Sequence, residues 1–378
     1  MRFAIDATPI VPDRKGVGIF LENVIDHIYR RSGSDSPLVY VGRSFYPEAQ
    51  RRWPFLALRP ICSRPSFLWE QYGLPLRVRR DGISVLFTGR ERTFLEPNCR
   101  TLAYLFEIPD YREENILRNG AGWYQKFSIK LSRKRFVQAT RSVTKFIASS
   151  IFTQNDLEFR YGVPKTRISL VYPGVDSRFH PAPSLQWRYQ IRNRFANGRK
   201  YVLHFATGDF RENTQIALRA FKDALEMILE DIQLLLVGVD YRQRLGLDRM
   251  VARYGLKDHV STAGFLSGDD LIMAYQGADA YLDPTRYEGF GFQNLEAMAC
   301  GVPVISSSVT SVPEVVGDAG LLFSPDDIDG FSSGLKTILN NSDFSEELKE
   351  KGLERAKQFT WEKSVGRILS IIQDEMRN

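Results

Sequence analysis

The sequence has 378 residues, with 51 Lys and Arg against 45 Asp and Glu, a net charge of +6, and 43% hydrophobic residues. This balance excludes a disordered or fibrous chain, and the length predicts two domains. No apolar run approaches the roughly 18 residues that span a bilayer, and Asp6 interrupts the N-terminal stretch where a signal peptide would be apolar. We therefore expect a globular protein that is made and kept in the cytoplasm.

Short apolar runs alternate with longer mixed segments in the first half of the chain. The runs predict buried strands, and the segment 17–31 predicts a helix between the first two. This alternation is typical of a doubly wound α/β domain with a parallel sheet. The strands are expected over residues 2–7, 38–43, 83–89, 101–107 and 146–150.

Positive charge is concentrated in the first half of the chain. Residues 1–170 contain 28 Lys and Arg against 16 Asp and Glu, whereas the remainder contains 23 against 29. Part of the excess lies over residues 124–146, where a helix would carry a basic face beside an apolar one. Three interpretations stay open: a solvated face, a surface for anionic lipid, or a nucleic-acid surface, which no accompanying motif supports. The basic residues are Lys126, Lys130, Arg133, Lys134, Arg135, Arg141 and Lys145.

A polar segment with several prolines, residues 172–200, predicts a linker, with the domain boundary near residue 180. Beyond it the pattern repeats, with helices expected over 213–229 and 267–278. An apolar stripe from Trp361 to Ile372 predicts a closing helix. The second set of strands is expected over residues 201–208, 232–239, 260–266, 280–286 and 302–308.

Two glycine-rich turns stand at predicted strand-to-helix junctions. Gly16 and Gly18 precede the first helix, and such glycines either let a ligand approach a helix start or merely form the turn. In the second half, "GFGFQNLEAMACG" places Gly291 before a helix that ends near Gly301. Its first amides could hold a phosphate.

Two glutamates flank this second turn. Glu288 lies on the loop and Glu296 lies within the helix, so both could border one pocket. A glutamate near a helix start is also favourable by itself, by roughly 0.3–1 kcal/mol. The residues alone leave both interpretations open.

The segment "RYEGFGFQNLEAMACGVPVISSSVTSVPEVVGDAGLLFSPDD" resembles the E-x7-E signature of family 4 glycosyltransferases. Matching blocks such as "FIASSIFTQNDLEFRYGVPKTRISLVYPGVDSRFHP" and "FATGDFRENTQIALRAF" follow in the right order, over nearly all of residues 145–330. The resemblance implies the GT-B fold, in which two Rossmann-like, doubly wound domains face each other across a cleft. It implies domains of residues 1–180 and 181–359, with the helix over 360–378 returning to the first.

The resemblance also implies roles for individual residues. Glu288 would bind hydroxyls of the donor sugar and Glu296 the ribose hydroxyls, since a carboxylate suits a vicinal diol. Gly16 and Gly18 would close on the donor, and Gly208 would line its site. Backbone groups would bind the diphosphate at Phe290, Gly291, Phe292 and Gln293, and the base at Phe265 and Leu266.

The sequence departs from the family pattern at two places. Arg211 matches a cationic position that would stabilise the leaving diphosphate, but the next position, usually lysine in relatives, is Glu212. Arg90 or Arg92 would then share the work.

In the first half, Phe106 and Glu107 stand where relatives often carry a histidine that contacts the donor. Glu107 would touch a substrate hydroxyl or simply end a strand. The four histidines, His27, His180, His204 and His259, are expected to be structural.

From this resemblance we expect a retaining enzyme that moves a hexose from a UDP-linked donor to a hydroxyl of a saccharide or lipid-linked saccharide. The catalytic set would be Glu288, Arg211 and Glu107. The basic half would contact the inner face of an anionic membrane. The alternatives are a non-catalytic nucleotide-sugar-binding protein, and an epimerase or phosphorylase on the same fold. A dinucleotide oxidoreductase is more remote, since neither glycine turn completes its fingerprint.

We expect no cofactor and no metal. No acidic cluster suggests a metal site, and the cysteines Cys62, Cys99 and Cys300 lack metal-ligand spacing and are expected to be free thiols in a reducing compartment.

Overall fold

The computed structural model describes residues 2–11, 16–31, 36–62, 69–90, 99–110, 122–239 and 241–377. The chain divides into two compact units. Unit 1 runs to Gly174 and resumes at Thr360, and unit 2 spans Val175–Phe359. The division lies a few residues before the boundary expected near residue 180.

Unit 1 is built on a parallel sheet whose strands follow the order β3-β2-β1-β4-β5-β6-β7. Its inner strands are buried on both faces, which explains their continuous apolar sequences. The strands are β1 (Phe3–Asp6), β2 (Leu38–Gly42), β3 (Ala57–Ile61), β4 (Val85–Thr88), β5 (Arg100–Leu105), β6 (Lys145–Ala148) and β7 (Ile168–Leu170).

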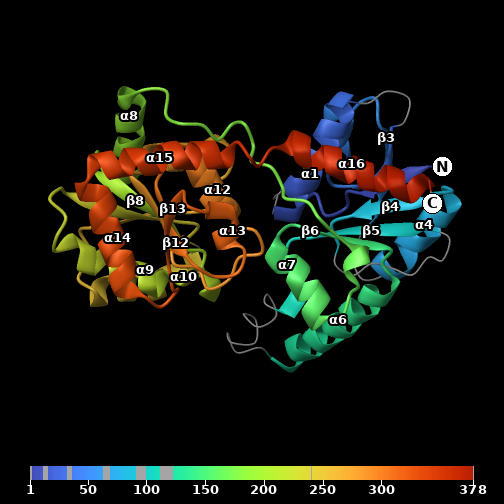
Figure 1. Cartoon of the computed structure of the whole chain (residues 1–378), viewed down its shortest axis with the longest axis horizontal. Coiled ribbons are helices and arrows are strands. Elements are labelled where there is room, and N and C mark those ends of the chain that lie inside the picture. The colour runs from blue at the N-terminus through green and yellow to red at the C-terminus, as the bar shows by residue number, and fades with distance from the viewer. Residues whose placement is uncertain are drawn as a thin grey trace. The chain divides into compact units, whose positions relative to one another are not determined.

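Helices cover both faces of this sheet. On one face, α1 (Gly16–Arg31) and the C-terminal helix α16 (Trp361–Arg377) pack together, as Figure 1 shows in blue and red. Their apolar side chains share one core, which includes Phe20 and Trp361. The closing helix therefore belongs to unit 1 although its sequence follows unit 2. The other helices are α2 (Tyr46–Arg52), α4 (Leu74–Arg80), α6 (Trp123–Ser142) and α7 (Ile151–Asn155), with π-helical turns at Trp69–Gly73 and Asp156–Arg160 and a 3₁₀ turn at Lys165–Arg167.

The helix expected over the basic segment is confirmed as α6. Its inward side chains Ile129, Phe136 and Ala139 are buried, and Phe136 meets Tyr161 edge to face with 4.8 Å between the ring centroids. Its basic side chains lie on the other sides of the helix.

Unit 2 repeats the architecture with the strand order β10-β9-β8-β11-β12-β13, again all parallel. The strands are β8 (Lys200–Phe205), β9 (Ile232–Val237), β10 (Val260–Ala263), β11 (Ala280–Asp283), β12 (Val304–Ser307) and β13 (Gly320–Phe323). The helices are α8 (Leu185–Ala196), α9 (Thr214–Leu225), α10 (Tyr241–Arg253), α11 (Asp269–Gly277), α12 (Phe292–Ala299), α13 (Val312–Val316), α14 (Ile328–Asn340) and α15 (Ser342–Ala356), with a 3₁₀ turn at Phe210–Glu212.

The ten strands and the helices expected from the sequence are confirmed, within a few residues at their ends. The linker expected over residues 172–200 is wrong for its second half, which contains a helix. Residues Leu185–Ala196 form α8, which begins where the Ser184 hydroxyl accepts a hydrogen bond from the Trp187 amide at 3.1 Å. Only Ile191 and Ala196 of this helix are buried, so it shows no clear apolar stripe. The sequence also failed to predict β3, β7 and β13, which are edge strands of their sheets.

The strand order reverses between β1 and β4 in unit 1 and between β8 and β11 in unit 2. In open parallel sheets, ligands bind outside the carboxyl ends of the strands at such a reversal. The turns that follow β8 and β11 are therefore the first place to look for a site in unit 2. Among the described residues, no helix has both the length and the hydropathy needed to cross a membrane.

Candidate functional site

The turn after β8 is closed by a glutamate. The Thr207 amide donates to Glu212 Oε2 at 2.7 Å, and the Thr207 hydroxyl contacts Glu212 Oε1. Gly208 has a φ of +81°, a conformation that favours glycine. The pKa of Glu212 is raised to about 7, chiefly by burial and also by the charges of Asp209 and Asp283, while the hydrogen bonds from Thr207 act in the opposite direction.

The loop after β11 is fixed at Glu288. The Glu288 amide donates to Thr310 Oγ1 at 3.0 Å, and the Ser311 hydroxyl donates to the Glu288 carbonyl at 2.8 Å. Thr310 has a φ of +53°, which is unusual for a β-branched residue and marks local strain. The segment after β12 therefore holds the backbone of Glu288 from both sides.

The helix α12 begins beside this loop. Gly291 stands before its first turn with a φ of +90°, and among the described residues no side chain caps that turn. The first amides of a helix have no acceptor within the helix, so they can hold an anion. Asn294, in the same turn, donates to Asp283 Oδ2 at the end of β11 at 2.9 Å and so ties the helix to the strand.

Two aromatic side chains fix the backbone at this turn. Phe290 is buried, and its ring lies 5.1 Å from that of Phe292 and 5.8 Å from that of Phe359, centroid to centroid. Gln293, the next residue of α12, is half-buried.

Glu296 lies one turn further along α12. Its Oε2 accepts a hydrogen bond from the Tyr275 hydroxyl at 2.9 Å. The pKa of Glu296 is raised to about 7, chiefly by burial and to a smaller extent by the charge of Asp176, while the hydrogen bond from Tyr275 lowers it. A carboxyl group in this state can both accept and donate hydrogen bonds near neutral pH.

The acidic side chains described above lie near one buried side chain, the phenol of Tyr281. Burial raises the pKa of Tyr281, on β11, well above its usual value, and the charges of Asp283, Glu288, Glu212 and Glu296 raise it further. The structure thus brings the two glutamates of the motif together with Glu212 at the carboxyl edge of the unit 2 sheet.

Arg211 lies at the same edge. Its guanidinium contacts the Asp209 carboxylate at 2.7 Å, and its carbonyl accepts from the Arg286 amide at 2.7 Å and from the Thr285 hydroxyl at 3.0 Å. The side chain is therefore oriented, and Asp209 partly offsets its charge.

The two residues expected to read the base follow β10. Phe265 is 79% exposed and Leu266 is half-buried. Gly264, just before them, accepts from the Gly238 amide at 3.1 Å, which joins their loop to the turn after β9.

Several of the residues that the sequence analysis singled out lie in unit 1. Gly16 is the first residue of α1. Gly18, in the same helix, packs against the backbone of Pro9, and an added Cβ would lie 3.3 Å from the Pro9 carbonyl oxygen. Phe106 packs edge to face on Phe20, with 5.2 Å between the ring centroids. Glu107 follows β5 and is half-buried.

A polar cluster lies where the strand order of unit 1 reverses. Arg90 donates from Nε to Asp6 Oδ2 at 3.0 Å and from Nη2 to the Thr8 hydroxyl at 2.8 Å, and Asp6 is fully buried. Arg90 is thus held at the carboxyl edge of that sheet. Arg92, its expected partner, lies outside the described residues.

The histidines make the structural contacts expected of them. His204 is buried, with Nδ1 at 2.9 Å from the Leu282 carbonyl and Nε2 at 3.1 Å from the Thr214 hydroxyl. Burial lowers its pKa to about 4, so the ring stays neutral at physiological pH. His27, His180 and His259 each contact a backbone carbonyl through Nδ1.

Sequence reasoning missed the residues that hold the acidic groups in place. These are Thr207, Tyr275, Asp283, Asn294, Ser306, Thr310 and Ser311. A partial signal was present, because Ser and Thr follow β12 where a parallel strand ends at a potential site.

The family described as "Glycosyl transferases group 1" matches residues 186–355, which lie within unit 2. This match to the group 1 glycosyltransferases covers 170 of the 378 residues, slightly less than half of the chain. The segment includes β8, β11 and α12, and therefore the whole acidic neighbourhood described above.

Relatives match across a longer part of the chain. "O-antigen chain mannosyltransferase B" of Escherichia coli is 29% identical over 240 residues, covering 64% of this chain and 63% of its own. "MMP alpha-(1->4)-mannosyltransferase" of Mycolicibacterium hassiacum is 24% identical over 281 residues, covering 70% and 63%. The chain thus spans somewhat less than two thirds of the length of each of these relatives.

Solved structures match nearly the whole chain. The structure of Anabaena Alr3699/HepE in complex with UDP and glucose has a TM-score of 0.74 at 17% identity and covers 99% of this chain. WaaG, a glycosyltransferase involved in lipopolysaccharide biosynthesis, has a TM-score of 0.72 at 14% identity and covers 98%. These matches establish the GT-B fold expected from the sequence, with two parallel-sheet α/β domains.

Proposed function

We propose that this protein is a hexosyltransferase that uses a nucleotide-diphosphate sugar and builds a glycan. The observation that carries the proposal is the grouping of Glu288 and Glu296 at the carboxyl edge of the unit 2 sheet, beside the start of α12. This segment matches the model of the group 1 family, which supports the proposal. A carboxylate on either side of an anion-binding helix start suits a ligand with a diphosphate between two sugar rings.

In this proposal, different residues of the motif bind different parts of the donor. Glu288 binds hydroxyls of the transferred hexose, and Glu296 binds the ribose diol. The amides at Phe290, Gly291, Phe292 and Gln293 bind the diphosphate. Because "O-antigen chain mannosyltransferase B" is 29% identical over 240 residues, mannose is our first candidate for the hexose. Backbone groups at Phe265 and Leu266 bind the base, for which UDP remains our expectation.

The reaction needs positive charge where the leaving diphosphate becomes more negative. Arg211, oriented by Asp209, supplies that charge together with the amides of α12. We propose a retaining reaction in which an acceptor hydroxyl attacks on the face that the diphosphate leaves. The bond from the anomeric carbon to the phosphate oxygen breaks, the bond to the acceptor oxygen forms, and the hydroxyl proton goes to the leaving phosphate.

We also propose roles in substrate binding for residues of unit 1. Gly16 and Gly18 let the backbone approach the donor, and Glu107 contacts a substrate hydroxyl. Arg90 is fixed by Asp6 and Thr8 at the reversal point of the unit 1 sheet, where it suits an anionic part of a substrate.

A product assay tests the proposal. UDP-glucose, GDP-mannose, ADP-glucose and TDP-glucose are incubated with the protein and a panel of oligosaccharides, and the products are analysed by mass spectrometry and NMR. We expect an acceptor lengthened by one hexose in the α configuration of the donor. A changed sugar without any acceptor would indicate an epimerase, and binding without turnover would indicate a nucleotide-sugar-binding protein; either result contradicts the proposal.

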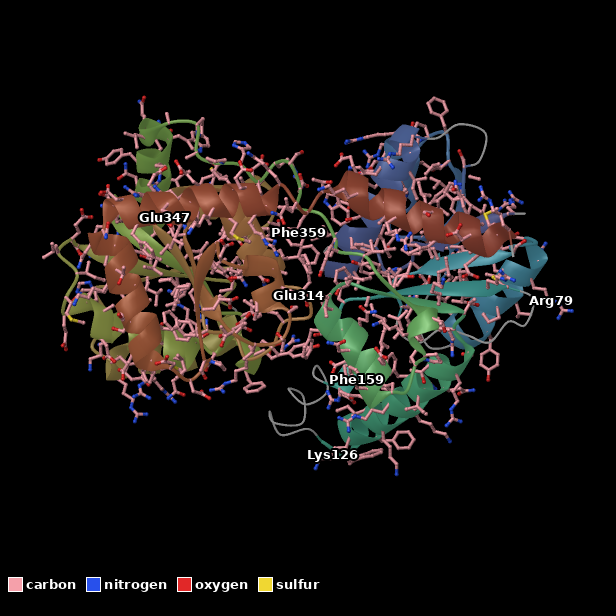
Figure 2. The ribbon with its side chains drawn as sticks, in the orientation of Figure 1. Arg79, Lys126, Phe159, Glu314, Glu347 and Phe359 are labelled. Carbon is pink, nitrogen blue, oxygen red and sulfur yellow. The ribbon has the colours of Figure 1, made fainter. Side chains whose placement is uncertain are left out.

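A second observation favours contact with an anionic membrane. The helix α6 carries six Lys and Arg and no acidic residue. The helix also exposes Trp123 and Phe127, at 81% and 61%. Lys126, which Figure 2 labels, is exposed on the same helix. A basic helix with exposed aromatic side chains suits the surface of anionic lipid. We therefore propose that the enzyme works at the cytoplasmic face of a membrane on a saccharide or lipid-linked saccharide.

A further inference from the structure

Glu212 occupies the position where the family resemblance leads one to expect lysine, and the structure shows what the carboxyl group does there. Both of its oxygens contact one residue. Oε2 accepts from the Thr207 amide at 2.7 Å, and Oε1 contacts the Thr207 hydroxyl. An acceptor that binds both the amide and the hydroxyl of Thr207, in the turn after β8, thus stands where a cation is expected.

Thr207 is placed to meet an anionic ligand. It is exposed, and it follows β8 at the point where the strand order of unit 2 reverses. Gly208, with its φ of +81°, turns the chain directly after it. The Thr207 methyl group lies beside Gly238, where an added Cβ would come within 2.6 Å of it, so glycine leaves the room that the Thr207 side chain occupies.

The surroundings keep both protonation states of Glu212 within reach. Partial burial raises its pKa to about 7, and the carboxylates of Asp209, on its own turn, and Asp283, on β11, act in the same direction. Arg211 is directed at Asp209, with 2.7 Å between the guanidinium and the carboxylate. Tyr281, also on β11, stays neutral because its own pKa is far above its usual value.

We propose that the proton on Glu212 sets the direction in which the Thr207 hydroxyl donates, and that binding of the donor diphosphate is thereby coupled to proton uptake. An ionised carboxylate can only accept, so the Thr207 hydroxyl donates to it. A neutral carboxyl group donates to Thr207 Oγ1 instead, and the hydroxyl hydrogen then turns to a phosphate oxygen. The amide contact to Oε2 is kept in both states. This inference rests on the proposed function, because it takes a nucleotide-sugar as the ligand.

Titration calorimetry tests the coupling in the full-length protein. Intact UDP-glucose, GDP-mannose, ADP-glucose and TDP-glucose serve as probes, without acceptor, because their diphosphate diesters do not titrate between pH 5.5 and 8.5. Each is measured in buffers of different ionisation enthalpy, which reveals protons taken up on binding. For the probe that binds, we expect uptake that approaches one proton above pH 8 and an affinity that falls toward tenfold per pH unit there.

Glu212→Gln is the decisive variant. Its amide can keep both contacts with Thr207 without titrating, so binding should lose its proton uptake and become nearly independent of pH. Glu230→Gln is the matched control. Glu230 precedes β9 and so lies at the amino end of a strand of the same sheet, away from Thr207, and this variant should keep the wild-type pH dependence. A purely structural role of Glu212 would alter affinity but not proton uptake.

The outcomes separate this inference from the proposed function. Binding by the wild-type protein without proton uptake, or equal uptake in Glu212→Gln, would overturn the inference and leave the proposed function intact. Failure of the wild-type protein to bind any of the four probes at any pH would overturn the proposed function and this inference with it.

Discussion

Glu296 carries a carboxyl group that its surroundings drive toward the neutral form. Below about pH 4.5 the group is protonated in both the native and the unfolded protein. Between about 4.5 and 7 the native protein holds a proton that the unfolded chain has lost, so stability must fall as the pH rises through this range. Glu212 and Asp283, with pKa values raised to about 7 and about 6, act in the same direction.

Glu296→Gln should therefore make the stability of the free protein less dependent on pH. The amide cannot ionise, so the variant should be more stable than the wild type at pH 8 by roughly 1–2 kcal/mol and nearly equal to it at pH 4.5. Urea unfolding at a series of pH values measures this difference. Glu230→Gln is the control and should follow the wild-type curve, and a Glu296→Gln curve parallel to the wild-type curve would contradict the account.

Arg211 tests the electrostatic part of the proposed reaction. Arg211→Ala should lower kcat by about 10²–10³, because a fixed cation at the leaving group stabilises the transition state more than the bound donor. Arg194→Ala removes a similar side chain that pairs with Asp270 at the surface, and it should leave kcat unchanged. A loss confined to KM in Arg211→Ala would show that the residue only binds the donor.

At the scale of elements, α12 owes its start to one glycine. Gly291 has a φ of +90°, which strains any residue with a Cβ. Gly291→Ala should lower the free energy of unfolding by about 1–2 kcal/mol and weaken donor binding, since the amides that follow would shift.

Gly246→Ala is a suitable control for this substitution. Gly246 lies within α10, and a Cβ there would meet no other atom within 4 Å. Alanine should therefore stabilise that helix by about 0.5–1 kcal/mol. Thermal unfolding of both variants tests the pair, and equal effects would contradict the role given to Gly291.

The elements also show how far sequence reasoning reached. Apolar periodicity predicted the inner strands and α9, α11, α12 and α16, because each has a continuous buried run or a clear buried stripe. It failed for α8, which buries few residues, and for edge strands such as β3, whose sequence contains Arg59 and Pro60. The resemblance singled out Glu288 and Glu296, whose charges both act on the buried Tyr281. It did not indicate that Thr310 and Ser311 hold the Glu288 loop, since long-range hydrogen bonds leave no pattern in the local sequence.

At the scale of the whole molecule, charge asymmetry motivates the membrane proposal. Vesicles with anionic lipid should bind the protein at low salt, and binding should weaken as salt rises. Reversal of Lys126, Lys130 and Lys134 on α6 to Glu should weaken it strongly, since each close Lys contributes roughly 1 kcal/mol. Sedimentation with vesicles measures the bound fraction.

A control on the other unit separates local charge from net charge. Reversal of Lys336, Lys349 and Lys351, on α14 and α15, changes the net charge by the same amount. If this variant loses vesicle binding as much as the α6 variant does, binding follows net charge and the role of α6 is contradicted.

The central claim is that two carboxyl groups at the carboxyl edge of the unit 2 sheet hold a nucleotide-sugar. The most direct test is thermal stabilisation of the wild-type protein, Glu288→Ala and Glu296→Ala by UDP-, GDP-, ADP- and TDP-sugars, since a ligand that binds the native state raises the melting temperature. We predict that one class of donor stabilises the wild-type protein and that each variant binds it about 10- to 100-fold more weakly, because a carboxyl group that hydrogen-bonds the ligand is lost. Equal stabilisation of all three proteins would contradict the claim.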